Sequence, residues 1–241
     1  MIRLKSYFKL HPFAKASALL ALFMLLFLLL MGFYFPAKGA NGFSSFIVAF
    51  EFSKSVSEIN SLFWGMSPAE IKSVDIGNIL DFGFMISYSL FIAMLYKTGS
   101  KVFEKKWLLI GIPLASIIFL SDFIENLTLF EITKNYLAAG NKTDLILLLK
   151  KLHIVTWIKW GGLAFSFLLF AIVLATQRWF YLILAAICML PTLYIIFLSN
   201  ASPYELSIFT DLIFISFFAL ILFSFIFKKS ELEKSFLNNK F

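Results

Sequence analysis

Six apolar runs of about 20 residues recur along this chain, and each is long enough to cross a lipid bilayer as an α-helix. A backbone inside the bilayer has no water to bond with, so such runs must form helices that satisfy their own hydrogen bonds. The predicted spans cover residues 15–36, 76–96, 107–130, 152–175, 179–198 and 205–227. The sequence therefore predicts an all-α integral membrane protein, with one six-transmembrane-helix bundle over residues 1–230 and a short cytoplasmic tail at 231–241.

Composition supports this class and argues against others. Hydrophobic residues make up 61% of the chain and charged residues 15%, against about 45–50% and about 25% in soluble domains. The net charge of +7 lies in short segments beside the apolar runs, not in a basic patch with base-stacking aromatics, so no nucleic-acid partner is expected. With two histidines and one cysteine, the chain predicts no metal centre, no cofactor and no internal disulfide.

The charges that flank the spans predict the orientation. With the N-terminus inside, the cytoplasmic segments carry thirteen Lys and Arg residues against three acids, and the outer segments carry seven of each. Lys and Arg concentrate in the cytoplasmic loops of membrane proteins. We therefore expect a multi-pass protein of a bacterial inner membrane, with both termini in the cytoplasm and residues 37–75 outside.

The outer loop, residues 37–75, is patterned like helix and not like a linker. Its apolar residues recur at near-helical spacing with Glu51 and Glu58 between them, which predicts an amphipathic helix on the outer surface. Ser67, Pro68 and Glu70 supply an N-cap, a proline at the first helical position and a carboxylate at the third. The second transmembrane helix is therefore predicted to begin within this loop, above the membrane.

Five ionisable residues interrupt the predicted spans: Asp81, Asp122, Glu125, Lys159 and Asp211. A charge in hydrocarbon costs roughly 2.5–3.5 kcal/mol on insertion scales, and intramembrane charges usually mark functional sites. Counting along each helix at about 1.5 Å per residue places all five about 8–12 Å below the outer surface. Charges at one depth on four helices predict a single polar site in the outer half of the membrane.

Helical spacing adds polar neighbours to this site, because residues three, four or seven apart share a helix face. By this rule Asn78 stands beside Asp81, and Asn126 stands beside Asp122. His153 lies near the outer end of the fourth span. The predicted ligand-binding residues are Asn78, Asp81, Asp122, Glu125, Asn126, His153, Lys159 and Asp211.

Three functions remain open for this site. The excess of carboxylates over one lysine favours binding or passage of a small polar or cationic ligand, or of a membrane lipid headgroup. A carrier of only six helices would be expected to work as a homo-oligomer.

The second function is an intramembrane enzyme that acts on lipid or isoprenoid substrates. Glu125 and Asp122 would then serve as general acid and base, paired with Lys159 or His153. In the third, the site is structural or serves assembly, and Lys159 neutralises a carboxylate to join two helices. One lysine cannot neutralise four carboxylates, so ligand binding or passage is the leading prediction.

Overall fold

The computed structural model describes residues 12–138, 142–177, 179–197 and 201–226, and every regular element within these ranges is a helix. The predicted all-α class is confirmed. The elements are α2 Pro12–Met31, α3 Phe46–Glu51, α4 Val56–Leu62, α5 Pro68–Val102, the 3-10 helix η1 Lys106–Ile110, α6 Gly111–Leu137, α7 Lys142–Ala175, α8 Trp179–Ile196 and α9 Pro203–Ile226.

Four stretches are long and apolar enough to cross a membrane: Pro68–Val102, Lys106–Leu137, Asp144–Ala175 and Pro203–Phe225. Lys15–Met31 in α2 and Tyr181–Ile196 in α8 are also apolar but shorter. Each of the six predicted spans overlaps one of these stretches, and four of the six have the length and composition to cross a membrane. Four apolar helices of this length indicate a membrane protein.

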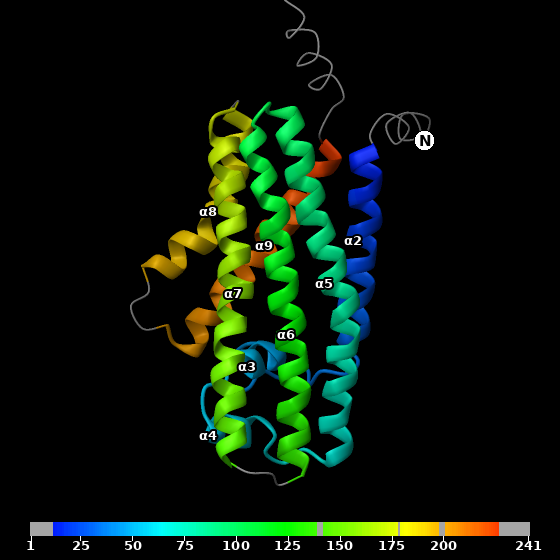
Figure 1. The fold of residues 1–241 in the computed structure, drawn as a ribbon, viewed down its shortest axis with the longest axis vertical. Coiled ribbons are helices and arrows are strands. Elements are labelled where there is room, and N and C mark those ends of the chain that lie inside the picture. The colour runs from blue at the N-terminus through cyan, green and yellow to red at the C-terminus, as the bar shows by residue number, and fades with distance from the viewer. Residues whose placement is uncertain (1–11, 139–141, 178, 198–200, 227–241) are drawn as a thin grey trace, which may run out of the picture.

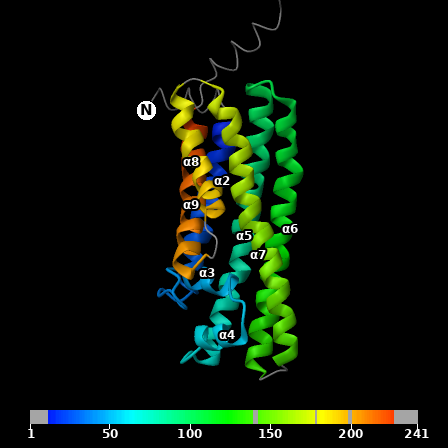
Figure 2. The same ribbon diagram turned by 90° about the vertical axis from the view of Figure 1, so that its left-hand side faces the viewer.

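The helices form two layers, which Figure 2 shows edge-on. One layer contains α5, α6 and α7, and the other contains α2, α9 and α8. Within and between the layers, α5 packs on α6, α6 on α7, α7 on α8, α8 on α9, α9 on α2, and α2 on α5. The helices therefore close into a ring, and the space between the layers is where a binding site can form.

Close packing of α2 on α5 depends on two glycines. The ring of Phe35 lies against Gly77 and the ring of Phe27 against Gly83, so that a Cβ added at either glycine would overlap the ring. Small residues allow membrane helices to approach in this way.

The start of α5 confirms the predicted early beginning of this helix. Ser67 is its N-cap, and Pro68 is its first residue. The Ser67 hydroxyl accepts from the Glu70 amide at 3.3 Å, and the Glu70 carboxylate accepts from the Ser67 amide at 2.7 Å. At about 1.5 Å per residue the 35 residues of α5 span roughly 50 Å, well beyond a hydrocarbon core of roughly 30 Å.

The segment before α5 differs from the single amphipathic helix that the spacing predicts. It contains two short helices, because Ser55 begins a second helix by forming a capping box with Glu58. Both helices pack at one end of the bundle, against the ends of α5, α6 and α7 (Figure 1). Phe50 and Phe63 are fully buried there, with ring centroids 5.3 Å apart. The apolar face of this segment thus contacts protein instead of lipid. The packing holds α3 at the end of the space between the two helix layers.

Candidate functional site

Polar side chains join α5 to α6 inside the bundle. The helices run antiparallel, so residues progressively further along α5 meet residues progressively earlier on α6. Three hydrogen bonds connect them: Thr133 Oγ1 to Asp75 Oδ1 at 2.7 Å, Asn126 Nδ2 to Asp81 Oδ2 at 2.8 Å, and Tyr88 OH to Asp122 Oδ2 at 2.5 Å. These bonds set the register of the two helices and orient the carboxylates of Asp81 and Asp122.

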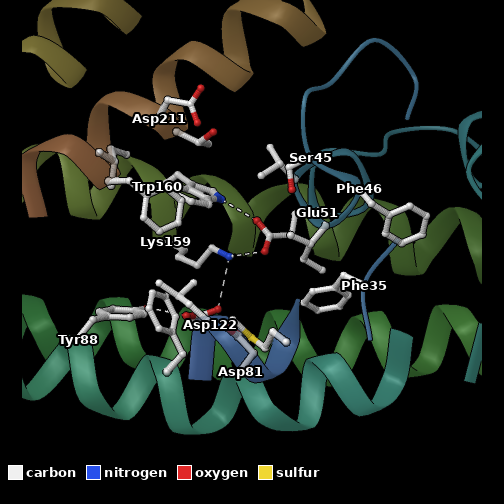
Figure 3. Close-up of a pocket in the computed structure, with 18 of the residues that line it drawn as sticks. Phe35, Ser45, Phe46, Glu51, Asp81, Tyr88, Asp122, Lys159, Trp160 and Asp211 are labelled. Carbon is white, nitrogen blue, oxygen red and sulfur yellow. Dashed lines mark hydrogen bonds and ion pairs between the residues drawn. The ribbon is translucent and has the colours of Figure 1, made fainter. Parts of the chain in front are cut away.

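Lys159 of α7 is the centre of a buried ion cluster (Figure 3). Its ammonium lies 2.9 Å from Glu51 Oε1 and 3.5 Å from Asp122 Oδ1, and it forms an ion pair with Glu125 Oε2. Its Nζ also lies 4.9 Å from the ring centroid of Trp160, within range of a cation–π contact. One lysine thus contacts carboxylates from α3 and α6.

Glu51 belongs to the cluster, although the sequence pattern predicted it in an amphipathic helix on the outer surface and not in the buried site. It ends α3, and its Oε2 accepts from Trp160 Nε1 at 2.8 Å while its Oε1 faces Lys159. Burial raises the pKa of the Glu51 carboxyl above its usual range, an effect that the Lys159 ammonium opposes but does not cancel. One signal in the sequence marks this residue: Glu51 interrupts an apolar run, with Phe50 before it and Phe52 after it.

Thr156 connects three helices at this point. Its Oγ1 lies 2.5 Å from Glu125 Oε1 and 3.1 Å from the backbone carbonyl oxygen of Glu51. Thr156 stands one turn before Lys159 on the same face of α7. The two residues therefore position both glutamates, one on α3 and one on α6.

A cavity of about 320 Å³ adjoins the cluster between the two layers. Its charged lining residues are Glu51, Asp81, Asp122, Lys159 and Asp211. The rest of the wall is mainly apolar and comes from α2 and the turn after it, α3, α5, α7 and α9. Glu125 is fully buried and does not line the cavity.

Aromatic rings pack beside the cavity on the side away from α3 and α4. Phe167 of α7 and Phe217 of α9 meet edge to face, with centroids 4.8 Å apart, and Tyr88 lies 5.7 Å from Phe217. Each of the three lies one or two turns further along its helix than the charged residues, away from α3 and α4. Tyr88 and Phe217 therefore form an aromatic wall of the cavity on this side.

The carboxylates differ in how many donors they meet. Both oxygens of Glu51 face donors, as described above. Asp122 Oδ1 has the Lys159 ammonium at 3.5 Å but no hydrogen bond within the described residues. Asp81 Oδ1 has no donor in the described part of the chain, and Asp81 is partly exposed because it lines the cavity. These two unsatisfied oxygens thus belong to two of the three aspartates that line the cavity.

The structure brings five of the eight predicted residues into contact: Asp81, Asp122, Glu125, Asn126 and Lys159. Asp211 lines the same cavity from α9 but is exposed and, among the described residues, makes no ion pair or hydrogen bond. Asn78 is fully buried, and neither polar atom of its amide has a partner within the described ranges. His153 lies outside the cavity lining, beside Trp157, with ring centroids 6.4 Å apart.

No group of three or more His, Cys, Asp or Glu side chains in the described ranges is arranged to hold a metal ion. Comparisons with protein-family profiles, curated proteins and solved structures find no match to this chain. Its function has to be inferred from the chemistry of the cavity.

Proposed function

We propose that this protein binds a cationic amphiphile, a molecule with an ammonium group and an apolar body, in the cavity between its two helix layers. The observation that carries the proposal is the pair of aspartate oxygens, one on Asp81 and one on Asp122, that lack hydrogen-bond donors and border an apolar cavity. Buried polar atoms normally have partners. A cation in the cavity would give both oxygens a partner of opposite charge.

The charge of the lining favours a positive headgroup. Four carboxyl groups and one ammonium line the cavity. In Figure 3, Asp81 and Asp122 lie on one side of Lys159, and Asp211 lies on the other. A cation bound beside Asp81 and Asp122 gains attraction from carboxylates in a site of low dielectric, where such attraction is strong. An anion would meet only Lys159, which already has three carboxylate partners.

The remainder of the cavity suits an apolar body. Phe35, Phe46, Phe84 and Phe214 contribute to its wall. Aromatic faces attract cations as well as alkyl groups. The volume lies at the lower end of the range of about 300–1,000 Å³ for small-molecule sites. An ammonium compound with a short alkyl chain matches both the charge and the size.

For the membrane we propose six spans, with α2 and α8 added to the four membrane-length helices. At about 1.5 Å per residue α2 extends roughly 30 Å and α8 roughly 27 Å, close to the hydrocarbon thickness. The first residues of α2 and the last of α9 lie at the end of the bundle opposite α3 and α4 (Figure 1). The excess of Lys and Arg in the segments that flank this end supports cytoplasmic termini, external α3 and α4, and residence in a bacterial inner membrane.

The aromatic side chains that pack on the side of the cavity away from α3 and α4 favour binding of a ligand from the outer half. They argue against its passage through the bundle. Phe167 and Phe217 pack edge to face further along their helices than Lys159 and Asp211, on the side away from α3 and α4. A continuous polar pathway would require these rings to part. Binding of the ligand is therefore the simpler function for this arrangement.

Cysteine labelling tests the proposed topology. The single Cys188 is changed to alanine, and one cysteine is introduced in place of exposed Asn60 in α4 or exposed Lys105 before η1. An impermeant maleimide is expected to label Asn60→Cys in intact spheroplasts, and Lys105→Cys only after permeabilisation. Labelling of Lys105→Cys in intact spheroplasts would overturn the orientation.

Titration with two matched amphiphiles tests the ligand. Decyltrimethylammonium is expected to raise the melting temperature of the protein in maltoside micelles, whereas decyl sulfate, with the same chain length and the opposite charge, is not. Asp81→Asn removes a carboxylate from the headgroup site, so we expect about tenfold weaker binding of the ammonium compound, equivalent to about 1.4 kcal/mol. Isothermal titration calorimetry gives the dissociation constants.

Two further variants complete this experiment. Asp211→Asn changes an exposed cavity residue and is expected to weaken binding without loss of folding, whereas Asp144→Asn changes an exposed acid outside the cavity and serves as the control. Equal binding of both amphiphiles, or wild-type affinity in both Asp81→Asn and Asp211→Asn, would refute the proposed function.

A further inference from the structure

The buried cluster contains more acid than base. Glu51, Asp81, Asp122 and Glu125 face a single ammonium, that of Lys159. Ionisation of all four acids would leave three uncompensated negative charges inside the protein. Buried charges without partners are so unfavourable that the groups become neutral instead. The empty site must therefore hold protons.

The contacts of Thr156 locate one of these protons. A hydroxyl group carries a single hydrogen, yet Thr156 Oγ1 lies within hydrogen-bond distance of both the Glu51 carbonyl oxygen and Glu125 Oε1. The carbonyl has no hydrogen to give. If Glu125 is protonated, it donates to Thr156 and leaves the Thr156 hydrogen for the Glu51 carbonyl, so that each contact is an ordinary two-centre hydrogen bond. Because Glu125 is fully buried and off the cavity wall, its proton has no direct route to a ligand.

A second proton belongs on the acid with the fewest donors. Glu51 meets Lys159 and Trp160, and Asp122 meets Lys159 and Tyr88, so each of these carboxylates has two partners. Asp81 accepts one hydrogen bond and, among the described residues, has no ion pair. Its free Oδ1 is therefore the place for a proton that the cavity can reach.

The surroundings of Asp81 agree with this assignment. The polar and charged groups near it from other helices are Asp122 and Asn126 of α6, Lys159 of α7, Glu51 of α3 and Asp211 of α9, across the cavity. The cavity residues of α2 are apolar. Three of these neighbours are acids and one is a base, so Asp81 is more stable neutral than ionised until another cation arrives.

We propose that the ligand cation exchanges for a proton on Asp81, so that the site is a cation–proton exchange site. This inference rests on the proposed function, because it concerns the same cavity and ligand. The empty site holds Asp81 as a carboxylic acid. When the cation binds, the O–H bond of Asp81 breaks, the proton passes to a base in the solvent, and the carboxylate pairs with the cation. The net charge of the site is the same before and after exchange.

Calorimetry in buffers with different ionisation enthalpies counts the released protons. Decyltrimethylammonium is the probe because it has a fixed charge and no acidic proton, so that every proton released comes from the protein. Titrations in phosphate and in Tris at the same pH are expected to give about one proton per bound probe. Affinity is expected to rise about tenfold per pH unit over the range in which Asp81 of the empty site is protonated, because binding releases one proton.

Two variants test the assignment to Asp81. Asp81→Asn keeps the size of the side chain but cannot lose a proton, so its residual binding is expected to release none and to be independent of pH. Glu125→Gln is expected to release about one proton, because Gln reproduces the neutral acid and can still donate to Thr156. Loss of proton release in Glu125→Gln would overturn the assignment to Asp81.

The titration of the wild-type protein also distinguishes failure of the proposed exchange from failure of the proposed function. If the wild-type protein binds the probe and releases no proton, the exchange is refuted and ligand binding stands. If the probe does not bind to the wild-type protein, the proposed function itself fails, and the exchange fails with it.

Discussion

Lys159→Met is expected to lower the free energy of unfolding by about 3–5 kcal/mol, because it leaves buried carboxylates without their cation. Methionine keeps the apolar stem of the side chain and removes only the ammonium group. Glu51 Oε1 and Asp122 Oδ1 then lose their charged partner, and both side chains are buried. Equilibrium unfolding of the purified protein in mixed micelles, with increasing denaturing detergent, measures the loss.

Lys151→Met is the matched control for this prediction. Lys151 also lies on α7 and pairs with Glu131 of α6, but at 3.9 Å and with both side chains about half exposed. An exposed pair contributes about 0–1 kcal/mol, so this change is expected to have little effect. The double variant Lys159→Met with Glu51→Gln should recover part of the loss, because it removes a stranded charge together with its partner. Equal destabilisation by Lys151→Met and Lys159→Met would show that the cluster does not stabilise the bundle.

Glu51→Ala is expected to loosen the short helices α3 and α4 and to lower the free energy of unfolding by about 3 kcal/mol. Trp160 Nε1 loses its acceptor and Lys159 loses one of its carboxylates. A buried donor without a partner costs about 1–3 kcal/mol, and more when it is charged. Hydrogen exchange followed by mass spectrometry is expected to show faster exchange over residues 46–62 than in the wild-type protein.

Glu131→Ala serves as the control, because it removes an exposed glutamate from α6 and leaves α3 untouched. Glu51→Gln should exchange more slowly than Glu51→Ala, since its amide oxygen can still accept from Trp160. Unchanged protection of residues 46–62 in Glu51→Ala would mean that the apolar contacts of Phe50 and Phe63 hold α3 and α4 without the help of Glu51.

Several features of the fold could be read directly from the residues. The apolar runs predicted the helices, because a chain in hydrocarbon must form its backbone hydrogen bonds within each segment. Ser67, Pro68 and Glu70 predicted the early start of α5, because a capping box depends only on neighbouring residues. The count along each helix predicted that Asp81, Asp122 and Lys159 lie at one level, since helical rise is constant.

Other features depend on contacts between distant segments. Glu51 belongs to the cluster because α3 folds back over α7, which no local pattern reveals. The same is true of the difference between Asp81 and Asp211, which the sequence predicts at similar depth. Asp81 has Asn126 as a partner, and Asp211 has none in the described part of the chain.

Some features could be predicted from the sequence and others could not, because the interactions that determine them act over different distances along the chain. Hydropathy, capping and helical rise act within a few residues, so the amino-acid order alone predicts the helices and the position of the charges along each helix. The rotation of each helix about its axis and the docking of α3 arise from packing between elements far apart in the chain. Packing therefore determines which carboxylates Lys159 pairs with and which remain open to a ligand.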